Sequence, residues 1–264
     1  MGYWNATHDR CRADCWLLRR TPSVIMRRGD DRRGPMCGRF STTRKVVEDV
    51  FLAMTGEPFP GEENLNTAPT ETAWVVRWKA EGYAALAARW WLTPYWSKTA
   101  APRYATFNAK CENLEKSGTF RDPFRYRRCV VPVGGFYEWT DSPLGRLPYH
   151  VEPADGGPLL LGGVWDRWRD RKTEEVLYSF AVVTTPVHPK LEWLHDRQPL
   201  MLSNADADVW MDHERSSSDL GDLFAPRLPG ALAAVPVSSY VGNARNKGSR
   251  CTEPIGDAVV VEPA

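Results

Sequence analysis

The sequence predicts a single β-rich α+β domain, in which a curved, barrel-like antiparallel sheet is accompanied by a few short helices. Many short apolar or alternating runs are bounded by Gly, Pro and Asp, which is typical of strands joined by turns. Few stretches show helical periodicity. The chain has 264 residues with 42% hydrophobic content, and no Gly/Ser- or Pro-rich linker divides residues 36–250. One core of ample size is therefore expected.

The expected elements follow from these runs. The predicted strands are Trp74–Trp78, Leu86–Leu92, Cys129–Val133, Phe136–Trp139, Leu159–Trp165, Leu177–Thr184, Leu200–Leu202 and Ala234–Val237. The predicted helices are Arg44–Phe51, a stretch near Thr119–Arg127, Lys190–Leu194 and Ala205–His213. Ser41 or Thr42 is expected to cap the first helix, and Ser203-Asn204 the last.

Both ends of the chain differ in character from the middle. Residues 1–35 contain three Arg-Arg pairs as well as Gly29, Gly34 and Pro35, so we expect a poorly structured extension. It is either upstream sequence from a misassigned start codon, with Met36 as the true initiator, or a basic arm that contacts DNA. Cys11 and Cys15 have no second pair of ligands nearby, so no metal is expected. Residues 251–264 are expected to form a loose tail.

Charge and composition limit the possible functions. The net charge is +1, but residues 1–35 carry eight Arg and four Asp, a balance of +4, so the remainder carries −3. Nucleic-acid binding would therefore need a local basic patch. No apolar run approaches the roughly 20 residues of a membrane span, and six irregularly spaced cysteines do not indicate a disulfide framework. We expect a soluble, cytoplasmic monomer without a cofactor, associated with the nucleoid if bacterial.

Four motifs carry the functional prediction: Met36-Cys37-Gly38-Arg39-Phe40, Asn108-Ala109-Lys110, Gly135-Phe136-Tyr137-Glu138-Trp139 and His195-Asp196-Arg197-Gln198-Pro199. In this order they resemble the SRAP family (SOS-response-associated peptidase fold), and the resemblance runs from residue 36 to about residue 248. Members of that family crosslink covalently to abasic sites in single-stranded DNA. In the family the cysteine is residue one of the mature chain, whereas here it is residue 37.

The chemistry implied by the resemblance explains why the cysteine must be N-terminal. An abasic site opens to an aldehyde, an amine attacks it to form an imine, and a neighbouring thiol closes a thiazolidine ring. Only an N-terminal cysteine offers both groups on one residue. An α-amine, with a pKa of about 7.7–8.0, is also more often uncharged near neutral pH than a lysine, by roughly 400-fold. With its nitrogen in a peptide bond to Met36, Cys37 cannot react in this way.

Three further residues receive catalytic roles by resemblance. Asn108 would hold the opened sugar or the thiazolidine. Glu138, a carboxylate inside an apolar strand, would take a proton from the Cys37 amine or thiol; a structural ion pair is the alternative, since buried carboxylates are rare unless paired. His195 would move protons at the sugar oxygen and the imine, which suits an ordinary imidazole pKa near 6.5. His150 and His188 lack such a context and are expected to be structural.

The expected DNA-binding residues are Arg39, Pro69, Trp96, Lys110 and Arg121. Pro69 lies in Asn64-Leu65-Asn66-Thr67-Ala68-Pro69, which is similar to the family's Asn-x-Ala-Pro loop, and Trp96 ends a Trp-rich segment; both would stack on bases. Lys110 replaces the family's arginine and loses its bidentate fork. Seven basic residues between 103 and 128 form the expected local patch. Gly242 and Asn243 would build the wall of the site.

Three functions are compatible with this sequence. The first is an abasic-site sensor that forms the thiazolidine crosslink after residues 1–36 are removed, with possible AP-lyase activity. The second is a cysteine peptidase that acts in cis at the Met36–Cys37 bond. The third is a non-catalytic single-strand-binding module.

Overall fold

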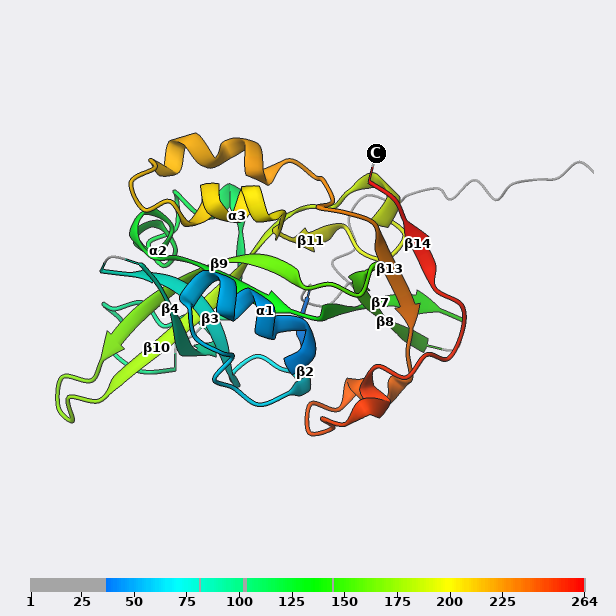
Figure 1. The fold of residues 1–264 in the computed structure, drawn as a ribbon. Coiled ribbons are helices and arrows are strands. Elements are labelled where there is room, and N and C mark those ends of the chain that lie inside the picture. Colours follow the sequence, from blue (N-terminus) through cyan, green and yellow to red (C-terminus); the bar gives the residue numbers. More distant parts are fainter. Residues whose placement is uncertain (1–36, 81, 102–103, 144, 264) are drawn as a thin grey trace, which may run out of the picture. The chain divides into compact units, whose positions relative to one another are not determined.

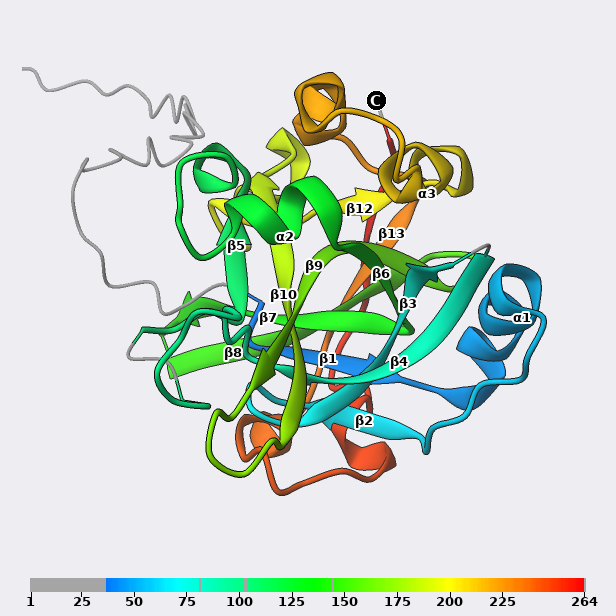
Figure 2. The same cartoon turned by 90° about the vertical axis from the view of Figure 1, so that its left-hand side faces the viewer.

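Five strands close into a barrel, which can be followed in Figures 1 and 2. This computed structural model describes residues 37–80, 82–101, 104–143 and 145–263. The barrel strands are β3 (Thr72–Lys79), β4 (Gly82–Trp90), β6 (Arg128–Val133), β9 (Leu159–Arg169) and β10 (Val176–Pro186). They pair in the ring order β3–β4–β10–β9–β6, and β6 pairs with β3 to close it. The predicted barrel-like sheet is therefore confirmed.

The barrel is antiparallel except where β10 pairs with β4, in parallel. Short strands extend this sheet at β10 and β9: β5 (Asn108–Lys110), β11 (Arg197–Pro199) and β12 (Met201–Leu202). β5 also runs parallel to β10, and β11 runs antiparallel to it. This arrangement brings together two segments that contain predicted site motifs, although about 85 residues separate them along the chain.

A second, fully antiparallel sheet has the order β14–β13–β8–β7–β1–β2. Its strands are β1 (Arg39–Thr42), β2 (Asn64–Thr67), β7 (Gly135–Ser142), β8 (Gly145–Pro153), β13 (Leu232–Pro236) and β14 (Val259–Val261). Only Gly134 separates β6 of the barrel from β7 of this sheet, and its N–H donates to the Ser41 carbonyl in β1 (2.8 Å). The segment that carries Cys37 therefore enters the fold where the two sheets meet.

Among the described residues, three α-helices lie on the outside of the sheets. They are α1 (Arg44–Thr55), α2 (Arg121–Tyr126) and α3 (Asn204–Met211). The rest of the helical structure is 3₁₀: Cys111–Asn113, Pro189–Leu191, Ser217–Phe224, Ser239–Gly242 and Ser249–Cys251. The prediction of few, short helices holds. Ser203 caps α3 through a capping box with Asp206, as expected, but residues 41 and 42 belong to β1 and Thr43 precedes α1.

Two sequence expectations concern the ends of the chain. Those for residues 1–35, including Cys11 and Cys15, lie outside the described residues. Residues 251–263, expected to form a loose tail, contact the rest of the fold at three points. Cys251 is buried, Pro254 forms a bridge with Val237, and β14 pairs with β13.

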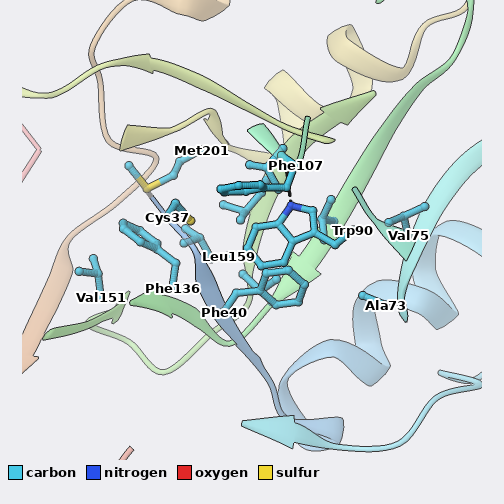
Figure 3. Packing of buried hydrophobic residues seen from close by; sticks show 14 of the residues in the cluster. Cys37, Phe40, Ala73, Val75, Trp90, Phe107, Phe136, Val151, Leu159 and Met201 are labelled. Atoms are coloured by element: carbon cyan, nitrogen blue, oxygen red, sulfur yellow. Dashed lines mark hydrogen bonds between the residues drawn. The ribbon is translucent and has the colours of Figure 1, made fainter. Parts of the chain in front are cut away.

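Trp90 lies at the centre of the largest buried cluster, inside the barrel (Figure 3). Its ring lies 4.7 Å from the Phe40 ring in β1 and stacks on Phe180 in β10, at 6.4 Å. The indole N–H donates to the Phe107 carbonyl (2.8 Å), so its polar atom is satisfied. This contact fixes the segment that leads into Asn108. Within the described ranges, no helix is long and apolar enough to cross a membrane.

Candidate active site

Cys37 lies two residues before β1, and its side chain belongs to the buried cluster around Trp90. It is fully buried, and Figure 3 shows it among Met201, Phe136 and Leu159. Burial raises the pKa of its thiol, and the nearby Glu138 carboxylate raises it further. The thiol is therefore protonated at neutral pH. Cys37 also has a φ of 44°, the left-handed region that is costly for a residue with a Cβ.

Glu138 in β7 accepts a hydrogen bond from the Cys37 backbone N–H, with N and Oε2 2.8 Å apart. Its other oxygen accepts the Trp139 N–H (3.1 Å). The carboxyl group is buried, and burial raises its pKa to about 7, with the two N–H bonds and Arg146 acting in the opposite direction. The closest contacts of Glu138 are thus backbone N–H groups, rather than the cation that a structural ion pair would require.

His195 lies in the segment that leads from Pro189–Leu191 to β11, and its ring is buried. Its Nδ1 lies 3.1 Å from the Arg197 backbone N–H, which donates to it, and 2.9 Å from Asp196 Oδ1. These contacts fix the orientation of the ring. The charge of Asp196 raises the pKa of Glu138, so this segment lies close to the carboxyl group.

Trp193 holds the same segment against the second sheet. The Thr140 hydroxyl in β7 donates to the Trp193 carbonyl (3.3 Å). The Trp193 ring meets the Tyr149 ring of β8 edge to face, at 5.0 Å. Glu138 and Tyr149 are paired across β7 and β8, so this contact docks the segment of His195 beside Glu138.

Asn108 begins β5 and is half-buried. It is paired with Val182 of β10. Phe107, immediately before it, belongs to the same buried cluster as Cys37 (Figure 3). The structure therefore brings the Cys37 and Glu138 motifs into direct contact, with the His195 motif beside Glu138, while Asn108 follows Phe107, which packs in the same cluster as Cys37.

Arg197 and Glu112 form a bidentate ion pair between the Asn108 and His195 segments. Nη1 lies 2.6 Å from Oε1 and Nη2 lies 3.0 Å from Oε2, while Nη2 also donates to the Thr184 carbonyl of β10 (2.6 Å). The hydrogen bonds from Arg197 hold the pKa of Glu112 down at about 2. Neither residue was assigned a role from the sequence, although Arg197 lies in a quoted motif and Glu112 lies two residues after another, because their pairing depends on the β5–β10–β11 order.

Arg39 and Pro69 lie on neighbouring strands at the start of the second sheet. Arg39 lies in β1, beside β2, and its Nη1 donates to the Gly38 carbonyl (2.7 Å). Pro69 follows β2 in a tight turn: the Ala68 N–H donates to Glu71 (3.0 Å), and Thr70, with a φ of 79°, donates its N–H to the Trp90 carbonyl (2.9 Å). The position of Pro69 is therefore fixed by the barrel core.

A loop from the C-terminal part of the chain closes this side. The Asn66 amide of β2 donates to the carbonyls of Val241, Asn243 and Asn246, at 3.0, 3.1 and 2.9 Å. Lys247 Nζ lies 2.6 Å from Glu71 Oε2. Asn243 thus contributes to a wall beside the Pro69 turn through its backbone.

The basic patch expected between residues 103 and 128 is partly neutralised within the described part of the chain. Arg103 lies outside the described residues. Arg125 pairs with Glu115 (2.7 Å), Arg127 approaches the buried Asp166 (3.2 Å), and Arg128 is buried. Lys110, Lys116 and Arg121 remain exposed, and Arg121 lies 3.5 Å from Asp122.

A wider basic groove, which sequence reasoning missed, lies beside Trp96. This exposed side chain donates its indole N–H to the Gly118 carbonyl (3.1 Å). The groove has a volume of about 550 Å³ and is lined by Trp96, Ser97, Lys98, Trp168, Arg169, Asp170, Arg171 and Lys172. The last five come from the end of β9 and the β9–β10 turn. The available signal was the run Arg167-Trp168-Arg169-Asp170-Arg171-Lys172.

These features define a β-barrel protein with a buried cysteine. The backbone N–H of this cysteine donates to a buried carboxyl group whose pKa is raised. Residues 36–244 match the family described as SOS response associated peptidase (SRAP). The chain therefore belongs to the SRAP family.

Several curated relatives carry related names. The chain is 31% identical over 218 residues to "Abasic site processing protein YMR114C" of Saccharomyces cerevisiae, which covers 80% of this chain and 55% of the yeast protein. It is 27% identical over 227 residues to "Abasic site processing protein YoqW" of Bacillus subtilis, covering 83% and 99%. It therefore spans about half of the yeast relative but nearly all of the bacterial one.

Solved structures support the fold alone. A Bordetella bronchiseptica protein aligns with a TM-score of 0.68 at 21% identity, covering 76% of this chain and 100% of that chain. A Bacteroides thetaiotaomicron protein aligns with a TM-score of 0.65 at 19% identity, covering 81% and 92%.

Proposed function

We propose that this protein, once its chain begins at Cys37, captures abasic sites in single-stranded DNA as a thiazolidine crosslink. The observation that carries the proposal is the 2.8 Å contact between the Cys37 nitrogen and the buried Glu138 carboxyl group. After cleavage, the same nitrogen would be an α-amine within hydrogen-bond distance of Glu138, which could accept its proton. The names of the curated relatives point to abasic sites as the target.

The proposed chemistry consumes one aldehyde and one aminothiol and releases water. The Cys37 amine adds to C1′ of the ring-opened sugar, the carbinolamine loses water, and Cys37 Sγ adds to the resulting imine carbon. Glu138 would take the proton that the ammonium loses and return one to the departing hydroxyl. His195 would protonate the sugar ring oxygen as the ring opens, and Asn108 would hold the product by hydrogen bonds. Loss of the 3′ phosphate from the imine is the accompanying lyase reaction.

Cleavage of the Met36–Cys37 bond in cis is the second proposed activity, and the backbone of Cys37 favours it. A φ of 44° at a residue with a Cβ costs about 1–2 kcal/mol, and the cost disappears when the preceding carbonyl leaves. Attack of Cys37 Sγ on the Met36 carbonyl would give a thioester and a free amine, and water would then release Cys37. Glu138, which is part-protonated near pH 7, would supply the proton to the departing nitrogen.

For DNA binding we propose the path from Arg39 and Pro69 to the groove beside Trp96. Lys98, Arg171 and Lys172 would contact phosphates there, and Trp96 would stack on a base. Lys110 and Arg121, both exposed, would contribute further phosphate contacts. Such contacts would be sensitive to salt and indifferent to sequence.

The test compares two chains on a synthetic oligonucleotide with one abasic site. A chain expressed from Met36, shown by intact mass to begin at Cys37, should form an adduct that survives denaturing electrophoresis. Cys37→Ala in that chain should remove the adduct. The intact 1–264 chain, with Met1 verified by mass, should bind the oligonucleotide without a stable crosslink.

The competing functions give different results. Cleavage of the precursor before Cys37 in the absence of DNA supports the peptidase step. Salt-sensitive binding without an adduct from the chain that begins at Cys37 would leave only a single-strand-binding module. A stable crosslink from the verified intact chain would refute the α-amine mechanism.

A further inference from the structure

A second group of chemically active side chains lies on the six-stranded sheet, apart from Cys37. Ser41 Oγ in β1 lies 2.8 Å from His150 Nε2 in β8. On the other side of the ring, His150 Nδ1 lies 3.1 Å from Glu152 Oε2. Because side chains alternate along a strand, His150 and Glu152 share one face of β8. The result is a hydroxyl–imidazole–carboxylate relay.

Gly135 makes this relay possible. β7 lies between β1 and β8, and Gly135 is the residue paired with Ser41. A Cβ at Gly135 would lie 2.6 Å from His150 Nε2 and 2.6 Å from the Val151 carbonyl oxygen. The missing side chain therefore leaves the space in which Ser41 and His150 meet across the intervening strand.

The contacts of the imidazole set its proton positions. The Glu152 carboxylate is an acceptor, so it favours the tautomer with the proton on Nδ1. Nε2 is then the acceptor for the Ser41 hydroxyl. The alternative acceptor for this hydroxyl, the Gly135 carbonyl oxygen, is farther away at 3.4 Å. The Tyr137 ring packs on the imidazole at 4.7 Å, and Ser41 and His150 are buried.

All three residues border one cavity of about 220 Å³. It is lined by Ser41, Thr43, Val46, Glu63, Leu65, Gly134, His150, Glu152, Gly156, Gly157 and Thr252. The Glu152 side chain is 41% exposed, so the cavity reaches solvent there. Its size suits a small acyl group. Glu63 and Glu152 make it unfavourable for anions, so neutral or cationic molecules fit best.

We propose that Ser41, His150 and Glu152 form a second, hydrolytic site that acts on small, uncharged or cationic carboxylic esters. Ser41 Oγ forms a bond to the acyl carbon while His150 Nε2 takes the hydroxyl proton. The ester C–O bond then breaks, and the alcohol leaves with that proton. Water, deprotonated by the same nitrogen, releases the acid and restores Ser41. Glu152 is the positioning residue that holds the ring.

The test uses an alkyl fluorophosphonate probe, which reacts with activated serines, and p-nitrophenyl acetate as the ester. Both are applied to the full chain carrying Cys37→Ala, so that the thiol cannot contribute. Peptide mass spectrometry should place the probe on Ser41, and Ser41→Ala should abolish both labelling and ester hydrolysis. Glu152→Gln should slow both by about tenfold or more. Ser249→Ala, which removes an exposed serine hydroxyl, is the matched control and should change neither.

Two further readouts make the outcome decisive. Circular dichroism and the midpoint of denaturation should show that Ser41→Ala and Glu152→Gln are folded. Ser41→Ala in the chain that begins at Cys37 should leave crosslinking to abasic DNA unchanged. The proposal is overturned by an unlabelled Ser41 at excess probe, or by folded Ser41→Ala and Glu152→Gln variants that hydrolyse the ester at the parent rate.

Discussion

Glu138 would occupy two different electrostatic states before and after the proposed cleavage at Cys37. In the intact chain it faces an uncharged amide N–H, and burial raises its pKa to about 7. An α-ammonium at the same 2.8 Å would attract the carboxylate and lower its pKa, while its own pKa would rise. The proposed cleavage would therefore change Glu138 from a group that is part-protonated near neutral pH into a carboxylate paired with the ammonium, and it must take that proton before the amine can attack.

Glu138→Gln should slow crosslinking by about 10² to 10⁴ in the chain that begins at Cys37, because the amide cannot take a proton from the amine. Affinity for the same oligonucleotide should stay within a few-fold, since Glu138 is buried and has no part in the proposed phosphate contacts. Single-turnover electrophoresis gives the rate, and fluorescence anisotropy gives the affinity. Crosslinking at the parent rate would show that Glu138 is not the base.

The raised pKa of Glu138 also predicts a pH dependence of stability in the uncleaved Cys37→Ala chain. Between about pH 4.5 and 7 the folded state binds a proton that the unfolded state has lost, so the free energy of unfolding falls as pH rises. The loss amounts to about 3 kcal/mol in total and levels off above pH 7. Urea denaturation at several pH values, compared with the same chain carrying Glu138→Gln, isolates this contribution. Parallel pH curves for the two chains would contradict it.

At the scale of elements, β10 is the strand that assembles the site. It pairs with β5 on one side and β11 on the other. The Asn108 and His195 segments therefore meet, although about 85 residues separate them along the chain. The Arg197–Glu112 ion pair joins the two segments, and Arg197 also donates to the Thr184 carbonyl of β10. A change in this pair should therefore affect both stability and the orientation of His195, whose Nδ1 accepts the Arg197 backbone N–H.

Glu112→Gln should destabilise the fold by about 1 kcal/mol at pH 7, a modest value because Glu112 is partly exposed and its charge is screened by solvent. The pKa of Glu112 is depressed to about 2, so its contribution is present above the ordinary carboxyl pKa and is lost as pH falls towards 2. Denaturation of the variant and the parent at pH 7 and at the lowest pH where both fold would measure this. If the difference in free energy of unfolding between the variant and the parent grew as pH falls, the predicted role of the Glu112 carboxylate would be contradicted.

The β9–β10 turn gives a prediction about DNA binding. Lys172→Ala should weaken binding of single-stranded DNA of any sequence and reduce the slope of log affinity against log salt by about 0.7, the value for one phosphate contact. Lys45→Ala removes the same charge from an exposed position on α1 and serves as the control. Anisotropy titrations at several salt concentrations provide the slopes. Equal effects of the two substitutions would mean that the groove beside Trp96 is not the DNA path.

At the scale of the whole molecule, the barrel core and the site are one packed unit. Trp90 contacts Phe40 of β1, donates to the carbonyl before Asn108 and accepts the Thr70 N–H that fixes Pro69. Trp90→Ala should lower the free energy of unfolding by about 3–5 kcal/mol, and Trp90→Phe by less. Chemical denaturation measures both. A loss below about 1 kcal/mol would place the main core elsewhere.

Much of this fold was predictable from apolar patterning. All eight predicted strands overlap observed ones, because their buried faces carry runs of Val, Leu and Trp. β8 was missed because Pro148 and the polar residues around it hide the alternation, although its His150 and Val151 are buried. β1, β2, β5, β11 and β14 were missed because four or fewer residues carry little periodicity. β1 and β5 also pair with strands that are distant in sequence, as in the pairing of Arg39 with Tyr137.

Some features of the candidate site were likewise predictable from the sequence, and others were not. Cys37 and Glu138 were named from their motifs, and the structure adds the hydrogen bond between them. The partial neutralisation of the basic patch was not predictable, because Arg127 meets Asp166 only after the barrel has formed. The relay of Ser41 and His150 depends on the absence of a side chain at Gly135, a third residue on the strand between them. No linear pattern contains that information.

The complete burial of Cys37 has a consequence for how such a protein is kept in the cell. A thiazolidine uses each Cys37 once, so the protein would behave as a reagent rather than as a catalyst with turnover. A reagent must survive unreacted until it is needed. Thiolates, not thiols, react with oxidants and electrophiles, and the raised pKa of this thiol keeps it in the less reactive form. For Cys37, resistance to unwanted reactions before an abasic site is met would matter more than the rate of crosslinking.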